Sequence, residues 1–390
     1  MSVTAVSYGR EVAVSTRRQR RSVLAVIRHL DYLLIASAFA LALLGIVMVY
    51  SATRGLLEQE GLSPHYYVER QVVWVLIGVL VMVGVAAIDY RHFRDWGYYI
   101  YGLVLLSLVG VFVVGKSALG AERWYQLGPL QLQPSEFAAL GLILAIATYC
   151  GRREGVLAFR EVLGLLVLAG VPMLLVFKQP DLGTTIILGV TLAAMMLAAE
   201  IRLRYLALLF LGVAFIFFAA IELHLLHGYQ LQRLDCFLHP NEHTNSWCYE
   251  ISMTKTAIAS GGLGGVGILH GAATNLALIP NQYTDFIFSA VGEQLGFVGS
   301  AVMLGLFGLV ALRMLRAAQM AKDEFGRMVC IGALAFLAFS VFENVGMNIG
   351  IMPITGIPLP FISYGGSASF AFFAAVGLVI NVEMRRTVHR

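Results

Sequence analysis

Charged side chains are scarce in this sequence of 390 residues. Only 13% of the residues are Asp, Glu, Lys or Arg, and 59% are hydrophobic, whereas a typical soluble domain carries about 25% charged residues. Repeated apolar runs of about 18–22 residues have the length that a helix needs to cross a bilayer. This composition excludes an ordinary soluble domain. We expect a polytopic membrane protein with one integrated helical bundle in the lipid bilayer, and no nucleic-acid partner.

Cysteine is also rare, and its spacing does not indicate a metal motif. The four cysteines include no CxxC pair and no Cys/His cluster, so we predict no zinc or other metal site. Cys150 and Cys330 fall in or near apolar runs and fit packing positions. Cys236 and Cys248 lie in a long polar segment. They could form a disulfide in an oxidising compartment or stay free, and the sequence leaves both alternatives open.

The N-terminal segment lacks the features of a cleaved signal peptide. It has no short apolar core followed by a small-residue cleavage site. It carries instead the arginines Arg10, Arg17, Arg18, Arg20, Arg21 and Arg28. We interpret residues 1–30 as a disordered, basic cytoplasmic tail that also contacts anionic lipid.

Ten apolar stretches after this tail predict ten transmembrane helices. Their ranges are 32–51, 70–88, 96–114, 134–150, 161–177, 182–199, 204–221, 286–312, 327–349 and 366–384. We expect them to form a single transmembrane domain at 31–385, followed by a short cytoplasmic tail at 386–390. An even number of spans leaves both termini on one side. The sequence shows no clear internal repeat, so it gives no support for an inverted-repeat transporter.

The distribution of Lys and Arg predicts the orientation, because cytoplasmic loops are enriched in these residues. With the N-terminus inside, most of the 27 basic residues fall on the cytoplasmic side. The outside ones are Arg54, Arg70, Lys116, Arg123, Lys178, Arg233 and Lys255. The predicted fold is an all-α polytopic membrane protein with both termini cytoplasmic. One long extracytoplasmic loop, residues 222–285, lies between helices 7 and 8.

The first polar cluster outside is ERWYQLGPLQLQPSE, in a segment, residues 115–136, that we expect to be a loop. Pro134 suits the first position of a helix and Glu136 the third, where a carboxylate is stabilised by the positive helix end. Glu136 therefore has a structural interpretation beside a functional one. Arg123 and Trp124 resemble an interfacial anchor pair. Alternatively, Arg123 binds a ligand phosphate.

The second cluster is KQPDLGTT, at a tight outside turn. Asp181 follows Pro180 and is a good N-cap for the sixth helix. Lys178 is one of the few outside cations, so it also qualifies as an anion contact.

The long outside loop holds the third cluster. GYQLQR follows the seventh helix, residues 251–260 predict a short amphipathic helix carrying Lys255, and SGGLGGVG is a flexible glycine run. We interpret the glycine run as a loop that lets helices approach. A nucleotide fingerprint is not credible here, because no strand precedes it.

The fourth cluster is NQYTDFIF, residues 281–288, with one carboxylate at the edge of a long apolar run. Asp285 is either a helix N-terminal residue, stabilised by the dipole, or a functional carboxylate, because a charge at this depth is costly unless paired or hydrated. The helix end lowers its pKa and burial raises it, and the sequence does not decide between them. Glu293 and Glu343 lie within spans and should face the bundle interior.

The last cluster, GIMPITGIPLPFISYGGS, predicts a broken helix at residues 350–366. Non-helical backbone at membrane depth is tolerated only against protein or a cavity, so the segment is either a packing loop or the wall of a cleft. Outside cations at headgroup level suit a phosphorylated lipid, and a carboxylate among them suits general-base chemistry. The residues alone thus indicate a membrane protein that handles lipid phosphates on its outer face.

Six motifs occur in the order seen in the SEDS family (shape, elongation, division, sporulation), which the sequence resembles from about residue 30 to residue 385. They are RWYQLGPLQLQPSE, QPDLGTT, YQLQR, SGGLGGVG, YTDFIFSAVGEQLGFVG and GIPLPFISYGGS. The segment GILHGAATNLALIPNQYTDF is more similar to the elongation branch than to the division branch. The resemblance implies ten transmembrane helices and peptidoglycan glycosyltransferase activity at the bacterial cytoplasmic membrane. It also implies lipid II as substrate and a class B penicillin-binding protein, a transpeptidase, as partner.

The resemblance also implies roles for single residues. Asp285 falls on the outside Asp of the family's TDFIF motif and is the expected catalytic residue. The expected substrate- and pyrophosphate-binding residues are Arg123, Trp124, Glu136, Lys178, Asp181, Gln232, Arg233, Lys255 and Thr284. The family usually has Lys three residues after the Glu of QPSE, and this sequence has Ala139 there. A Glu–Lys pair at that place is therefore in doubt, and Lys178 or Lys255 would have to substitute.

We therefore hypothesise that Asp285 accepts a proton from the 4-hydroxyl of lipid II. That oxygen attacks the anomeric carbon of the growing glycan, which is still on its lipid pyrophosphate. Arg123, Arg233 and Lys255 would hold the leaving pyrophosphate, where charge grows in the transition state. A divalent cation, Mg²⁺ or Mn²⁺, is compatible with the carboxylates, but no ligand spacing requires it.

Three rival functions stay open. A lipid II flippase would use the same basic pocket, but it needs polar groups on both faces, whereas the complex loops here are all outside. A septal polymerase of the division type would share the chemistry and differ in its cellular role. A scaffold would tolerate replacement of the outside charges.

Overall fold

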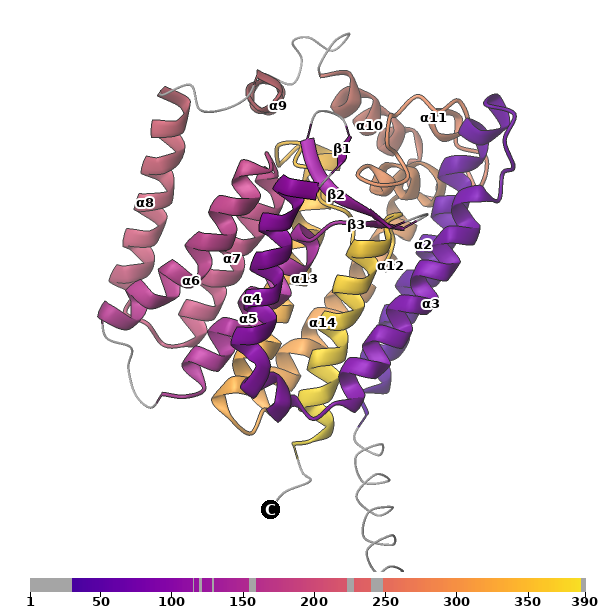
Figure 1. The fold of residues 1–390 in the computed structure, drawn as a ribbon. Coiled ribbons are helices and arrows are strands. Elements are labelled where there is room, and N and C mark those ends of the chain that lie inside the picture. Colours follow the sequence, from indigo (N-terminus) through magenta and orange to yellow (C-terminus); the bar gives the residue numbers. More distant parts are fainter. Residues whose placement is uncertain are drawn as a thin grey trace, which may run out of the picture.

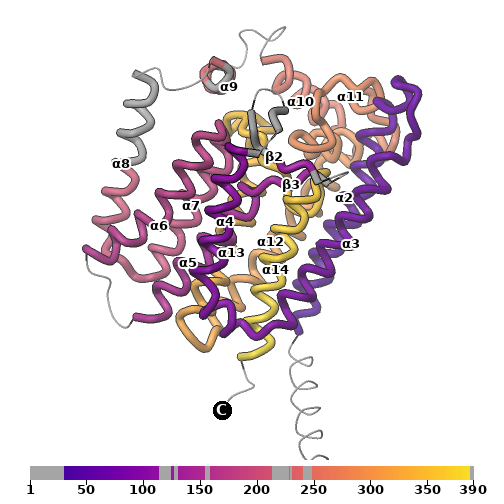
Figure 2. Tube along the Cα trace, viewed as in Figure 1, coloured from indigo at the N-terminus to yellow at the C-terminus, as the bar shows by residue number. Residues whose placement is uncertain are grey.

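A computed structural model describes residues 30–386, apart from residue 115 and residues 119–120, 128–129, 154–158, 223–227 and 240–247. The long helices lie side by side in one bundle, and a layer of short elements covers one end of it (Figure 1, Figure 2). Nearly all of the predicted tails, 1–30 and 386–390, lie outside the described residues.

Within the described residues, a helix overlaps each of the ten predicted spans. These helices are α2 (Tyr32–Gln59), α3 (Tyr66–Ala87), α4 (Tyr90–Val114), α5 (Ser135–Cys150), α6 (Phe159–Lys178), α7 (Leu182–Ala198), α8 (Leu203–Glu222), α12 (Ile287–Gln319), α13 (Glu324–Ile349) and α14 (Gly366–Met384). Seven of them, α2, α3, α4, α6, α12, α13 and α14, are long and apolar enough to cross a membrane, and α5, α7 and the first half of α8 are shorter apolar helices. The chain is therefore a multi-pass membrane protein.

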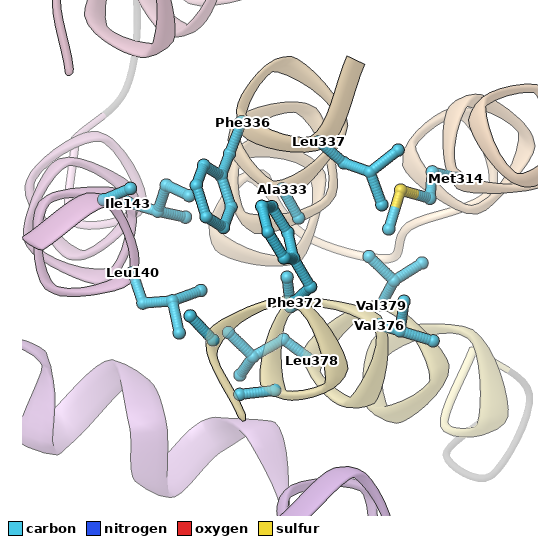
Figure 3. Packing of buried hydrophobic residues seen from close by; sticks show 14 of the residues in the cluster. Leu140, Ile143, Met314, Ala333, Phe336, Leu337, Phe372, Val376, Leu378 and Val379 are labelled. Carbon is cyan, nitrogen blue, oxygen red and sulfur yellow. The ribbon is translucent and has the colours of Figure 1, made fainter. Parts of the chain in front are cut away.

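The core of the bundle forms around α13 and α14. Nearly every residue of α14 is buried, as expected for a helix that is apolar on all sides. Phe336 of α13 stacks on Phe372 of α14, with ring centroids 4.8 Å apart (Figure 3). The outer helices instead expose large apolar side chains such as Leu80 of α3 and Leu103 of α4. These surfaces suit contact with lipid.

The ends of the described chain meet at one end of the bundle. Asp31 caps α2 by accepting hydrogen bonds from the amides of Leu33 and Leu34. Its second carboxylate oxygen pairs with Nε of Arg313, at the end of α12, over 2.5 Å. Glu383, near the end of α14, lies within electrostatic reach of Asp31. The two ends therefore lie on the same side, in agreement with an even number of spans.

The opposite end carries a small antiparallel sheet that was not predicted. Its strands are β1 (Lys116–Ala118), β2 (Ala121–Leu127) and β3 (Leu130–Leu132), in the order β1-β2-β3. Tyr125 of β2 lies opposite Leu132 of β3. The expectation of a loop at 115–136 missed this sheet, because β1 and β3 have only three residues each and β2, AERWYQL, does not alternate apolar and polar residues. The fold is otherwise helical.

Three short helices, α9 (Gly228–Leu238), α10 (Tyr249–Ser260) and α11 (Ala272–Asn275), occupy the long segment between α8 and α12. The helix predicted at 251–260 is confirmed, and it begins two residues earlier. The GYQLQR motif was expected to lie in a loop but forms the first part of α9. Leu231, Leu234 and Leu238 recur there at helical spacing, but the helix is too short and too polar to be found as an apolar run.

Candidate active site

Asp285 lies in a turn that is fastened to α13. Its amide donates a hydrogen bond to the carbonyl oxygen of Asn281 over 3.1 Å. Its own carbonyl oxygen accepts hydrogen bonds from the side-chain amides of Asn344, at 2.8 Å, and Asn348, at 3.3 Å. Helix α12 begins after the cap residue Phe286, so Asp285 precedes the helix. Asp285 is thus one residue before the cap and still close to the positive end of the helix, so both interpretations of this residue stay predictions.

The broken segment, residues 350–366, forms the other wall of this turn. Asn344 also donates to the carbonyl oxygen of Ile357 over 2.8 Å, and the hydroxyl of Ser363 donates to the carbonyl oxygen of Thr284 over 2.5 Å. Gly356 has φ +79°, and a Cβ atom there would lie 3.3 Å from Oδ2 of Asp285. The carboxylate thus faces the backbone of the broken segment at close range.

Asp181 brings two sequence motifs together. It is the N-cap of α7, as predicted, and accepts hydrogen bonds from the amide and hydroxyl of Thr184. It also accepts from the hydroxyl of Ser135 at 3.2 Å and the amide of Gln133 at 3.4 Å, both of the QPSE motif. Gly183 packs against the side chain of Ile357, so the start of α7 also touches the broken segment.

Burial raises the pKa of Asp285 to about 7. Arg233 on α9 opposes this effect by favouring the charged form, and so does hydrogen bonding by Thr284. Glu250 on α10 and Asp181 raise the pKa further because they carry the same charge. Burial therefore outweighs the stabilisation of the ionised form, which the sequence alone did not decide.

Glu136 belongs to the same group of charges. It lies in the first turn of α5, as predicted, is half-buried, and is within electrostatic reach of Asp181 and Asp285. Ala139, one turn later, is buried with 1% exposure. A lysine at that position would have to lie in the packed interior of this protein.

Lys255 lies on α10, the short helix on which it was predicted, and contacts the end of α13. It is half-buried on α10, and its Cε and Nζ atoms lie against Gly350, where a Cβ atom would come within 2.2 Å of Cε. Gly350 ends α13 with φ +82°. A cation at a helix C-terminus is stabilised by the carbonyl end of the dipole, which explains Lys255 without a ligand.

The remaining predicted residues are spread over the outer layer. Trp124 is half-buried on β2, while Lys178 at the end of α6 and Gln232 on α9 are exposed. Arg123 belongs to β2, but its side chain lies outside the described part of the structure. The structure thus brings together Asp285, Thr284, Asp181, Glu136 and Arg233 from the predicted set.

Sequence reasoning missed Asn344, Asn348 and Glu250. The two asparagines are one helical turn apart inside an apolar span, and this spacing is a usable signal for a polar function. Glu250 gives no such signal, because a Glu in an outer loop is ordinary. Only the folded position of α10 brings it to Asp285.

The two other intramembrane acids face the interior, as predicted. Glu293 of α12 accepts hydrogen bonds from the amides of Ala273 and Thr274 and from the hydroxyl of Thr274, so it holds the start of α11. Glu343 of α13 accepts from the hydroxyl of Thr355 over 2.8 Å, which fastens the broken segment to α13.

The glycine run packs against α12, which confirms the interpretation of a loop of close approach. Helix α12 breaks at Gly296, with φ 65° and ψ −163°, so that two amides after the break donate to carbonyl oxygens of the run. In return, the amides of Val266 and Gly267 donate to the carbonyl oxygens of Glu293 and Gln294.

Possible metal ligands and surface cavities bear on which groups the protein can bind. In the described ranges, no three His, Cys, Asp or Glu side chains are arranged to hold a metal ion, so no step is derived through a divalent cation. Two surface cavities of about 410 and 500 Å³ have linings that do not include Asp285.

The structure also joins Cys236 and Cys248 in a disulfide, whereas Cys150 and Cys330 are free and buried.

Comparison with known proteins agrees with the order of the motifs. Residues 31–388 match the FtsW/RodA/SpoVE family of cell cycle proteins. The chain is 34% identical over 362 residues to the peptidoglycan glycosyltransferase MrdB of Escherichia coli K12, covering 92% of this chain and 94% of that protein. It is 33% identical over 364 residues to a probable peptidoglycan glycosyltransferase FtsW of Geobacter metallireducens, covering 92% and 96%.

A solved structure has the same fold. The chain superposes with a TM-score of 0.78 and 30% identity on a chain from a study of how a peptidoglycan synthase complex coordinates polymerization and crosslinking, covering 92% of this chain and 98% of that one. The expectation drawn from the six motifs is confirmed: the chain belongs to the FtsW/RodA/SpoVE family, which is the SEDS family.

Proposed function

We propose that this protein is a peptidoglycan glycosyltransferase that polymerises lipid II during cell elongation. The observation that carries the proposal is Asp285, a half-buried carboxylate with a pKa of about 7 among charged groups from α5, α7, α9 and α10. The relatives named peptidoglycan glycosyltransferases support the same reaction here. A general base titrating near neutral pH is suited to proton abstraction.

We further propose a location and a topology. The protein lies in the bacterial cytoplasmic membrane as one domain, residues 31–385, with ten transmembrane helices and both termini in the cytoplasm. In this arrangement Asp285 and the short elements around it lie on the extracytoplasmic face. The excess of Lys and Arg at the opposite end of the bundle supports this orientation in the membrane.

In the proposed reaction, the 4-hydroxyl of lipid II attacks the anomeric carbon of the growing glycan. The hydroxyl proton passes to the carboxylate of Asp285 and the lipid pyrophosphate leaves. Arg233 supplies positive charge near the carboxylate, where it can stabilise the leaving pyrophosphate, and Arg123 is a second cation of the same face. The hydrogen bonds of Asn344 hold the Asp285 turn and the broken segment in one arrangement, which orients the base.

We propose a class B penicillin-binding protein as the partner. The solved neighbour comes from a peptidoglycan synthase complex in which polymerization and crosslinking are coordinated, and a transpeptidase would supply the crosslinking. A septal role is the second candidate, because a relative named FtsW is almost as similar as MrdB. Depletion of the protein separates the two roles. Loss of rod shape supports elongation, and filamentation without septa supports division.

Replacing Asp285 with Ala tests the chemistry. We expect Asp285→Ala to fold and insert but to lower polymerisation of purified lipid II by at least 100-fold, since general bases contribute about 10²–10⁴-fold. Glu60→Ala, an exposed acid at the end of α2, is the matched control and should keep full activity. Long glycan made by the native chain excludes a flippase as the sole function, and normal polymerisation by Asp285→Ala refutes the base assignment.

A further inference from the structure

A disulfide joins two of the short helices that cover the outer end of the bundle. It links Cys236 on α9 to Cys248, the N-cap of α10, and the two residues are 1% and 0% exposed. Arg233 lies almost one helical turn before Cys236, and Glu250 lies in the first turn after Cys248. The two groups that act on Asp285 from α9 and α10 therefore flank the crosslink.

The crosslink belongs to the same packed cluster as the Asp285 turn. Both cysteines lie in a small hydrophobic cluster with Phe286, Met347 and Ile354. Phe286 directly follows Asp285, Met347 belongs to α13, and Ile354 belongs to the broken segment. The disulfide thus attaches α9 covalently to the layer that holds the carboxylate.

Helix α9 has little else to hold it in place. It has 11 residues, and isolated helices shorter than about 12–15 residues are marginal in water. Among the described residues, no other element packs extensively against it, and Leu231 and Leu238 are exposed. The covalent link to α10 is therefore a strong constraint on the position of α9, the helix that carries Arg233.

We propose that the Cys236–Cys248 disulfide is a positioning element of the active site, which holds Arg233 beside Asp285 and makes glycan polymerisation depend on oxidation of this cysteine pair. The inference rests on the proposed function. Two thiols become one disulfide by exchange with a disulfide oxidant, whose own disulfide becomes two thiols, so electrons and protons balance. Such oxidation is available only in an extracytoplasmic, oxidising compartment.

The charges around Asp285 decide in which direction its pKa shifts when the disulfide is reduced. Among the described residues, the charged and titratable groups within electrostatic reach of Asp285 are Arg233 of α9, Glu250 of α10, Asp181 at the start of α7, Glu136 of α5 and Tyr283 of its own turn. Arg233 is the cation of this set and favours ionised Asp285. When α9 moves away, the acidic groups stay, so Asp285 ionises at a higher pH and the base form is depleted at neutral pH.

The test compares oxidised and reduced forms of the full chain with purified lipid II. The native protein is reduced with a phosphine, free thiols are counted by alkylation and mass spectrometry, and kcat is measured from pH 5.5 to 9. We expect the midpoint of the pH profile to rise by about one unit, because an opposite charge nearby shifts a carboxyl pKa by about 1–3 units. The rate at pH 6.5 then falls about tenfold further than the rate above pH 8.5, where only the loss of Arg233 from the leaving pyrophosphate acts, and reoxidation restores the profile.

Matched variants separate positioning from general stability. Arg233→Gln should show the raised midpoint while oxidised, and reduction should have no further effect on it, whereas Arg233→Lys should restore part of the native profile. The double variant Cys236→Ser, Cys248→Ser should show the raised midpoint and be insensitive to the phosphine. This variant keeps Cys150 and Cys330, so its insensitivity to the phosphine would show that these two cysteines do not cause the effect of reduction. Size-exclusion chromatography checks that each form is folded.

Two outcomes overturn the inference. One is an unchanged profile in the double cysteine variant. The other is a loss of rate by the same factor at every pH with no shift of the midpoint, which would show that the disulfide does not act on Asp285 through Arg233. The proposed function fails differently, because then the oxidised native chain and Asp285→Ala would make the same amount of glycan.

Discussion

At the scale of the residue, Asp285 and Glu293 have different roles because their surroundings differ, although both lie in one motif. Glu293 is 1% exposed and its two oxygens accept three hydrogen bonds from Ala273 and Thr274, so it is fully engaged in holding α11. The carboxylate of Asp285 faces Gly356 and several charged groups. The sequence marks both acids as costly at their depth, but only the environment identifies the one available for chemistry.

The pH dependence of polymerisation should report Asp285. Its pKa is raised from an ordinary value of 3.8 to about 7, and a general base acts only when deprotonated. The rate at saturating lipid II should therefore rise with pH through a midpoint near 7 and fall about tenfold per unit below pH 6. The initial rate of glycan formation between pH 5 and 8.5 measures this. A midpoint near 4 would contradict the assignment, and Glu60→Ala should leave the midpoint unchanged.

At the scale of the element, glycine allows α12 and the preceding loop to share backbone hydrogen bonds. The φ and ψ angles of Gly296 lie in a region that is essentially restricted to glycine. The amides of Phe297 and Val298, freed by the break, donate to the carbonyl oxygens of Gly262 and Leu263. Two motifs that look unrelated in the sequence, SGGLGGVG and GEQLGFVG, are therefore one structural unit.

Replacing Gly296 with Ala should disrupt this unit. A Cβ atom there would lie 2.2 Å from the amide nitrogen of Gly265, and the backbone conformation is strained for any other residue. We expect a loss of roughly 3 kcal/mol or more in stability, measured as a lower unfolding temperature by size-exclusion chromatography after heating. Gly305→Ala, also in α12 but with open space at its Cβ position, is the control and should be neutral or slightly stabilising. Equal unfolding temperatures for the two variants would contradict the prediction.

At the scale of the whole molecule, the two ends of the bundle hold different groups. One end holds the Asp31–Arg313 pair and the ends of the described chain, and the other holds the sheet and the short helices α9, α10 and α11 (Figure 1), together with Asp285 just before α12. Lipid-facing helices such as α3 and α4 lie between them. The core around α13 and α14 is filled by buried apolar side chains, so we expect a large polar substrate to bind at one end of the bundle and not between these helices.

Labelling of single cysteines should show which end faces outside. Glu60→Cys, at the Asp285 end, should react with a membrane-impermeant maleimide in intact spheroplasts. Arg91→Cys, exposed at the opposite end, should react only after the membrane is opened. The native chain is the background control, because Cys150 and Cys330 are buried and the other two cysteines are bonded. Reversed reactivity would overturn the proposed orientation.

Several properties follow from the sequence because they depend on neighbouring residues in the chain. Run lengths of apolar residues predicted the helix positions, Lys and Arg predicted the orientation that we propose, and the order of motifs indicated the family. The cap at Asp181 and the helix at α10 were also predictable, since capping and amphipathic periodicity are local. The strands were missed because they show no alternating pattern, and α9 was missed because a search for long apolar runs does not find a short amphipathic helix.

The grouping of the charges around Asp285 was decided only by the tertiary structure. Glu136, Asp181, Arg233 and Glu250 come from four elements far apart in the sequence, and no local rule brings them to one carboxylate. The balance between burial and positive charge that sets the pKa of Asp285 depends on distances and solvent access, which exist only in the folded chain. The disulfide that connects Arg233 to the Asp285 turn likewise requires α9 and α10 to meet. The sequence by itself thus determined the family and the helices, and the packing of those helices decided how the candidate base is tuned.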